Sequence, residues 1–161
     1  MKEIQLTQGK IALVDDADFE QVNRYKWYAK RSPKRVYVSR NLPLSGRKRT
    51  TQYLHQFLLN PPENSEIDHL DHDGLNNQRS NLRVCSTAEN RRNVPVRINN
   101  KSGFKGIRWR KDLQLWHARI CYNRKRIHLG YFPDPVSAAM AYNTAAKDLH
   151  GEFACLNPIP D

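Results

Sequence analysis

The chain has 161 residues, of which 39% are apolar and 27% are charged, and its formal net charge is +11. This composition is typical of a folded protein and excludes an intrinsically disordered one, and the sequence contains no apolar run of the roughly 20 residues that a membrane-spanning helix needs. Three widely spaced cysteines exclude a disulfide framework and a cysteine zinc site, and the first residues lack the apolar core of a secretory signal, so we expect a cytoplasmic protein with no membrane partner.

The positive charge is concentrated in one segment. Residues 91–130 contain 12 of the 27 Lys and Arg residues and a single acid, Asp112, whereas the 15 basic and 15 acidic residues elsewhere cancel. A neutral body with one basic segment indicates a surface that binds a polyanion. The alternative is a solvated basic face without a partner.

Residues 1–60 are predicted to form a mixed β/α part. Three β-like runs occupy residues 10–15, 25–30 and 35–40, and the acidic segment between the first two reads as a short helix. A second helix is expected near residues 52–60, where Tyr53, Leu54, Phe57 and Leu58 have helical spacing and the sequence "NPP" follows.

Residues 66–93 predict a strand, a loop around Gly74, a second strand and a helix. Ser86, three residues before Glu89, has the capping-box pattern that starts a helix. So small a unit has almost no core of its own and no paired cysteines, so a divalent cation is a reasonable candidate for holding its polar residues together.

The last third predicts a three-stranded antiparallel sheet packed on one amphipathic helix. Three β-like runs cover residues 104–110, 115–122 and 125–132. The helix is expected between Asp134, which can cap its start, and Gly151, which can end it. Its apolar stripe comprises Ala138, Ala141, Tyr142, Ala145 and Leu149. The fold class predicted for the whole chain is therefore α+β.

The polar residues of the 66–93 segment resemble those of a known family. Asp68-His69, Asn81 and Glu89-Asn90 stand at the spacings of the HNH nucleases, also called ββα-metal nucleases, and the resemblance is closest to the phage-type homing endonucleases. The resemblance implies that His69 accepts a proton from water and that Asn81 orients its ring. It also implies that Asp68 and Asn90 hold one divalent ion, Mg²⁺ or alternatively Mn²⁺, and no structural zinc is expected.

Neighbouring residues of a strand point to opposite faces, so Asp68 and His69 can serve one site only if the strand is irregular. We therefore expect a bulge or a strong twist there. His55, in the helix before the motif, is either a structural or an active-site residue. Asn76 and Asn77 are expected to stabilise turns.

A second resemblance covers residues 102–157. The runs "KGIRWR", "WHARI", "HLGYF" and "GEFACLN" are similar in order to the plant APETALA2/ethylene-response-factor DNA-binding domain. In that family the sheet lies in the major groove of DNA, so the resemblance implies a contact set of Lys105, Arg108, Arg110, Arg119, Arg126 and His128. The plant family typically has an acid at Arg119 and Trp at His128, so base preference should differ.

These observations predict a metal-dependent endonuclease that cleaves double-stranded DNA. The expected division is a nuclease domain at residues 1–94, a linker at 95–101 and a DNA-binding domain at 102–157. The chain would act as a monomer or weak homodimer in a bacterial or phage-infected cell, and a monomer would nick one strand. The alternatives are a non-catalytic DNA-binding regulator with a decayed nuclease part and, less favoured, an RNA-binding protein.

Overall fold

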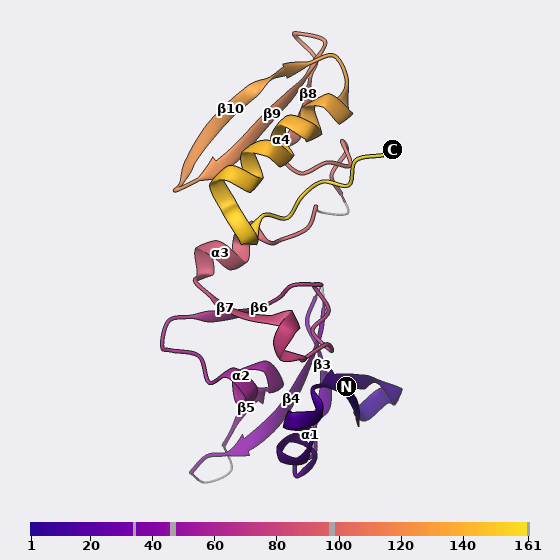
Figure 1. Ribbon diagram of the computed structural model, residues 1–161, viewed down its shortest axis with the longest axis vertical. Helices are drawn as coiled ribbons and strands as arrows, with labels where there is room; N and C mark the ends of the chain where they lie inside the picture. The colour runs from indigo at the N-terminus through magenta and orange to yellow at the C-terminus, as the bar shows by residue number, and fades with distance from the viewer. Residues whose placement is uncertain (34, 46–47, 97–98, 161) are drawn as a thin grey trace. The chain divides into compact units, whose positions relative to one another are not determined.

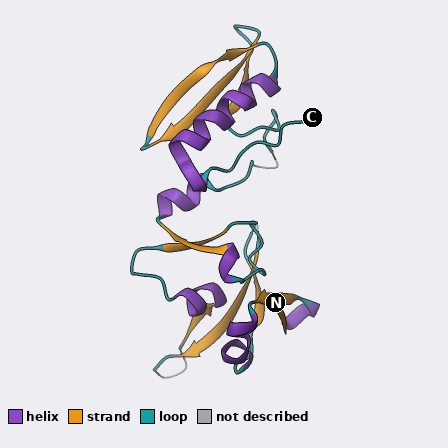
Figure 2. Cartoon of the chain, viewed as in Figure 1, coloured by secondary structure: helices purple, strands orange, loops and turns teal. Residues whose placement is uncertain are grey.

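The computed structural model describes residues 1–33, 35–45, 48–96 and 99–160, which form two compact units, Met1–Thr87 and Ala88–Asp161 (Figure 1). Small antiparallel sheets and a few helices build the described residues, which confirms the α+β class (Figure 2). None of the described helices is long and apolar enough to cross a membrane. Residues 97 and 98 of the expected linker lie outside the described residues, and the expected domain boundaries stay predictions.

The first unit contains three separate sheets. They are β1–β2, β3–β4–β5 and β6–β7, and every pairing in them is antiparallel. The elements in chain order are β1 (Lys2–Gln5), η1 (Thr7–Gly9), β2 (Ile11–Val14), α1 (Asp16–Asn23), β3 (Tyr28–Arg31), β4 (Val36–Pro43), β5 (Arg49–Tyr53), α2 (Leu54–Leu59), β6 (Glu66–His69), η2 (Arg79–Asn81) and β7 (Leu82–Cys85).

The core of the first unit lies between its sheets and α2. Val14, Val22, Val38 and Leu54 are fully buried in it. The helix predicted near residues 52–60 begins only at Leu54, because Tyr53 is still paired with Ser39 as the last residue of β5. Strands β1 and β5 were not expected from the sequence.

The second unit is one sheet covered on one face by a helix. Its strands are β8 (Ile107–Arg110), β9 (Leu115–Tyr122) and β10 (Lys125–Phe132), with β9 in the centre. Helix α4 (Pro135–His150) packs along the sheet (Figure 1). The short α3 (Thr87–Arg92) and η3 (Gly151–Phe153) complete the elements.

Helix α4 begins and ends where the sequence predicts. The Asp134 carboxylate accepts a hydrogen bond from the backbone N–H of Ser137 at 2.8 Å, and Gly151 ends the helix with a φ of 55°. The buried face is rotated from the expected stripe. It comprises Ala138, Ala139, Tyr142, Ala146 and His150, while the expected Ala141, Ala145 and Leu149 are only half-buried.

The small residues of α4 let the helix lie close to the sheet. At Gly106, the backbone before β8 also lies close to this helix. A Cβ atom on Gly106 would lie 2.3 Å from the Tyr142 ring and 2.5 Å from the carbonyl oxygen of Arg119, and its φ is +80°. Glycine has no Cβ atom to clash with these neighbours and adopts a positive φ without strain. The backbone before β8 is therefore held against the helix and the sheet, which fixes where β8 starts.

Candidate functional site

Asp68 and His69 are the last two residues of β6, which pairs with β7 as a regular two-stranded ribbon. Asp68 lies opposite Arg83 and His69 lies opposite Leu82, with no register shift between them. The expected bulge is therefore absent from this pairing. The alternative expectation, a strong twist that brings both side chains to one site, stays a prediction.

The Asp68 carboxylate is buried against a cation. Only 2% of Asp68 is exposed, and its Oδ2 accepts hydrogen bonds from Arg83 Nη2 at 2.7 Å and Arg83 Nε at 3.1 Å. An ionised carboxylate is stable in such a place only when it is paired and hydrogen-bonded. Asp68 therefore presents a hard, charged oxygen ligand at the end of β6.

The His69 imidazole is buried among aromatic rings. It is 2% exposed, and its ring centre lies 6.0 Å from that of Tyr37 and 5.1 Å from that of His55. Its Nε2 atom is buried with no hydrogen-bond partner among the described residues. Buried polar atoms without a partner are rare and costly, so this atom marks the ring as a functional candidate.

Burial also sets the charge of His69. It lowers the pKa of His69 below the ordinary value of 6.5, and the neighbouring Arg35 cation acts in the same direction. The Asn77 amide and the Asp71 carboxylate oppose this effect in part. The net result is an imidazole that is neutral near pH 7 and can accept a proton.

Asn81 holds the loop that follows β6. Its Oδ1 accepts a hydrogen bond from the backbone N–H of Asp71 at 3.0 Å, and its Nδ2 donates to Asp71 Oδ1 and to the carbonyl of Asn76, both at 2.9 Å. All three hydrogen bonds join the Asn81 amide to other residues of the loop, and none of them is made with the His69 ring. Asn81 thus shapes the backbone beside His69, and the ring-orienting role stays a prediction.

The loop is also fastened to β2 and to β4. The backbone N–H of Leu13 donates to the carbonyl of Leu75 at 3.0 Å, and that of Asn77 donates to the carbonyl of Leu13 at 2.8 Å. A Cβ atom on Gly74 would lie 2.6 Å from the Tyr37 ring. The loop therefore packs against the same tyrosine that contacts His69.

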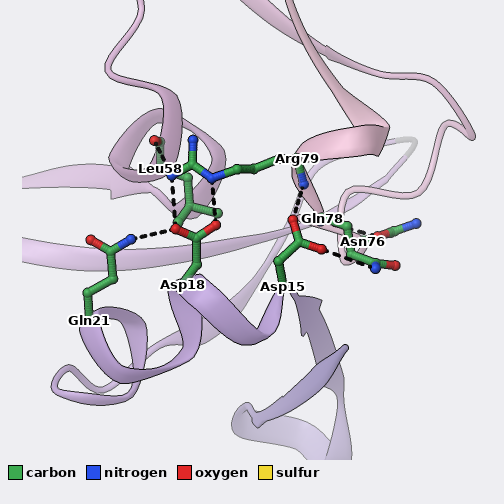
Figure 3. A network of polar contacts seen from close by, with 7 residues as sticks. All are labelled: Asp15, Asp18, Gln21, Leu58, Asn76, Gln78 and Arg79. Atoms are coloured by element: carbon green, nitrogen blue, oxygen red, sulfur yellow. Dashed lines mark hydrogen bonds and ion pairs between the residues drawn. The ribbon is translucent and has the colours of Figure 1, made fainter.

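An ion pair between a buried carboxylate and a half-exposed guanidinium, which the sequence did not reveal, joins η2 to α1 (Figure 3). Asp18 is 3% exposed and accepts hydrogen bonds from Arg79 Nε at 2.7 Å and Arg79 Nη2 at 2.9 Å. Gln21 Nε2 donates to the same carboxylate, and Asp15 accepts from the backbone N–H of Arg79 (Figure 3). Asp18 and Arg79 are 61 residues apart, and no local sequence pattern predicts that they form a pair.

The predicted DNA contacts gather on one face of the sheet in the second unit. Strand register puts Arg108 and Arg110 of β8, Arg119 of β9, and Arg126 and His128 of β10 on the face away from α4. We call these five residues the basic face. Arg110 is already engaged there, because its guanidinium pairs with Asp112.

Lys105 does not join the basic face. Its ammonium group donates to the carbonyl oxygens of Arg92 at 2.6 Å and Val94 at 2.7 Å. Burial lowers the pKa of Lys105. The residue stands before the start of β8, where strand alternation no longer governs its direction. Its expected DNA contact stays a prediction, apart from the basic face.

Two further residues of this face were missed from the sequence. His117 Nε2 lies 2.8 Å from His128 Nδ1, and both rings contact Tyr131. A register shift in β10 between His128 and Gly130 brings Tyr131 to this face. Alternation alone could have found His117, which stands two residues before Arg119 on the same strand.

Comparison with known proteins identifies the family. The HNH endonuclease family model matches residues 60–92, which span β6, the loop and β7. An uncharacterized HNH endonuclease of Acanthamoeba polyphaga mimivirus is 30% identical over 154 residues, which cover 94% of this chain and 77% of that protein. The chain belongs to the HNH endonuclease family. It is a nuclease of the HNH type, which favours the enzyme over the non-catalytic regulator.

Two other relatives match parts of this HNH endonuclease. Protein 3.8 of Escherichia phage T7 is 32% identical over 93 residues, which cover 58% of this chain and 76% of that protein. An ethylene-responsive transcription factor of Arabidopsis thaliana is 45% identical over 56 residues, which cover 34% of this chain and 30% of that factor. No solved structure is significantly similar to the chain.

The sequence-predicted residues of the HNH motif are distributed over both units. Asp68, His69 and Asn81 are buried in the first unit. Asn90 lies half-buried on α3, within the second unit, and its role as a metal ligand stays a prediction. Among the described residues, no group of three or more His, Cys, Asp or Glu side chains could hold a metal ion.

The Asp18–Arg79 pair should contribute to the free energy of unfolding of the first unit, Met1–Thr87. Replacing Arg79 by alanine leaves the Asp18 carboxylate without its cation, which we expect to destabilise Met1–Thr87 by about 1 to 2 kcal/mol, because the guanidinium is half-exposed. Hydrogen exchange of the amides in that unit measures the change. Arg24→Ala, at an exposed position that ends α1, is the matched control and should change protection little.

The difference between wild type and Arg79→Ala should depend on pH. The hydrogen bond from Arg79 lowers the pKa of Asp18 in the folded protein, so its contribution is present above the unfolded-state pKa of this carboxyl. It is lost as the pH falls through the folded-state pKa. Equal protection in Arg79→Ala and Arg24→Ala at pH 7 would contradict the structural role of the pair.

Proposed function

We propose that this HNH nuclease hydrolyses phosphodiester bonds of double-stranded DNA at the end of β6 and holds the duplex with the basic face. The observation that carries the proposal is the buried, neutral His69 imidazole next in sequence to the buried Asp68 carboxylate. These residues stand within the segment that the HNH endonuclease family model matches.

His69 supplies the base for the reaction. Its neutral ring accepts the proton of a water molecule as the water oxygen forms a bond to phosphorus. The bond from phosphorus to the leaving oxygen breaks on the far side, because such a displacement is in line.

The Asp68 carboxylate at the end of β6 is the kind of oxygen ligand that a hard divalent cation such as Mg²⁺ or Mn²⁺ takes. Asn90, on α3, is the second ligand that the resemblance implies, and water and phosphate oxygens would complete the coordination. Such an ion, when bound, stabilises negative charge on the leaving oxygen. Arg83 already contacts the Asp68 carboxylate and orients it.

Binding of duplex DNA is assigned to the basic face. Arg108, Arg119 and Arg126 are arginines on one face of a sheet, and a sheet of this size can enter the major groove. The similarity to a plant transcription factor and the net charge of residues 91–130 both support this assignment. By the resemblance, this face belongs to an APETALA2/ethylene-response-factor-like domain.

Removing divalent metal tests the proposed reaction. In a supercoiled plasmid assay with Mg²⁺, open circles should form before any linear product, because one active site per chain cuts one strand. Chelation with EDTA should stop cleavage, and excess Mg²⁺ should restore it. Cleavage that persists in EDTA, or the absence of cleavage with either Mg²⁺ or Mn²⁺, would contradict the proposal.

A further inference from the structure

Two rings that precede the HNH motif in the sequence contact the His69 ring, and Tyr53 packs against both of them. Tyr37 belongs to β4, Tyr53 ends β5, and His55 lies in the first turn of α2. His55 and Tyr37 both contact the His69 ring, with centroids 5.1 Å and 6.0 Å away. The imidazole of His69 is thus oriented by rings from outside the HNH motif.

His55 is itself held in place on two sides. It stacks on Tyr53 with a centroid distance of 5.4 Å and an interplanar angle of 10°, and it meets Tyr37 edge-on at 5.9 Å. Its ring is nearly perpendicular to that of His69, at 88°. His55 is 8% exposed, so its ring has little freedom to turn.

The contact between His55 and His69 is made through their ring planes and edges. His55 Nδ1 is buried with no hydrogen-bond partner among the described residues, as is His69 Nε2. The Asn81 amide is bound within the loop, so the aromatic rings and the Asn77 side chain are the contacts that act on the His69 ring.

We propose that His55 is a positioning residue, which fixes the plane of the His69 imidazole and thereby the direction in which it accepts a proton. This inference rests on the proposed role of His69 as the base. Burial, and secondarily the nearby His69, lowers the pKa of His55 to about 3, so the ring stays neutral in the working range. A neutral neighbour does not oppose the positive charge that His69 acquires during the reaction.

Two substitutions distinguish the effect of a planar ring at position 55 from the effect of merely filling the space. His55→Phe keeps a planar ring of similar shape, whereas His55→Leu fills the space without a plane. We expect His55→Leu to lower kcat about 10²-fold, since a small misplacement of a catalytic group has that effect. KM should not change, and His55→Phe should stay within about threefold of wild type, because an aromatic ring can keep the edge-on contact.

A double variant tests whether His55 acts through His69. If it does, His55→Leu combined with His69→Ala should be no slower than His69→Ala alone, because both changes remove one function. Additive losses, or a kcat loss in His55→Leu that matches only a loss of folded protein by circular dichroism, would overturn the inference. So would wild-type cleavage by His55→Leu, or equal losses in the leucine and phenylalanine variants.

The single His69→Ala variant separates this inference from the proposed function. If His69→Ala is inactive while folded His55→Leu cleaves normally, only the positioning role of His55 fails. If His69→Ala itself cleaves normally, the base has been assigned wrongly, and both proposals fail together.

Discussion

Replacing His69 by asparagine is expected to lower the single-turnover cleavage rate 10²- to 10⁴-fold, roughly the contribution of a general base. Asparagine can fill part of the pocket beside Tyr37 but cannot accept a proton from water at neutral pH. DNA affinity should stay within about twofold, because the basic face lies in the other unit and is not altered. Cleavage of a labelled duplex under enzyme excess measures the rate, and a binding titration without metal measures the affinity.

The chain offers a matched control three residues away. His72 is half-buried at a φ of 65°, and its Nδ1 lies 3.3 Å from Arg35 Nη2. Asparagine tolerates such a backbone well, so His72→Asn should fold and cleave within a few-fold of wild type. If His72→Asn lost activity while His69→Asn retained it, the base would be His72.

Removing three arginines of the basic face together is the second change with a large expected effect. The variant with Arg108→Ala, Arg119→Ala and Arg126→Ala should bind duplex DNA about 10²- to 10³-fold more weakly at moderate salt. Each lost phosphate contact also removes about 0.9 from the slope of log affinity against log salt concentration. The slope should therefore decrease by roughly 3, which a titration at several salt concentrations measures.

Lys147 provides the control for charge alone. It is exposed on α4, which covers the opposite face of the sheet, so Lys147→Ala removes one positive charge away from the basic face. Affinity and salt slope should stay close to wild type. If Lys147→Ala had as large an effect per charge as the three arginines, binding would depend on net charge and not on this face.

The elements that the sequence predicted well have local causes. Asp134, Pro135 and Gly151 mark the ends of α4 through capping and backbone preferences that operate within a few residues. The turn between β9 and β10 is similarly local, since Asn123 has the positive φ of 47° that a tight turn needs. Alternation along a strand likewise puts Arg108 and Arg110 on one face whatever the strand pairs with.

The features that escaped prediction depend on contacts distant in the sequence. Asp18 becomes buried only because Arg79 reaches it from η2. Tyr53 stays in β5 because it pairs with Ser39, although its spacing suits the following helix. Lys105 does not lie on the basic face, because its ammonium group donates hydrogen bonds to two backbone carbonyl oxygens near α3. A pattern read along one segment carries no information about such partners.

The same distinction between local and distant contacts applies to the candidate site. The family spacing predicts its residues, which are Asp68, His69, Asn81 and Asn90. It does not predict which side chains surround them. The expected bulge is absent since Arg83, directly across the ribbon, binds Asp68 on one face. His55 was ambiguous because no local pattern shows that α2 presents it to His69.

The catalytic role of the β6 end is tested most directly by a crystal structure of the protein with uncleaved duplex DNA and Mn²⁺, in which anomalous scattering locates the metal. We expect the metal at bonding distance from an Asp68 carboxylate oxygen, with a phosphodiester beside the His69 imidazole. A metal and phosphate bound away from β6, with no metal at Asp68, would contradict the assignment.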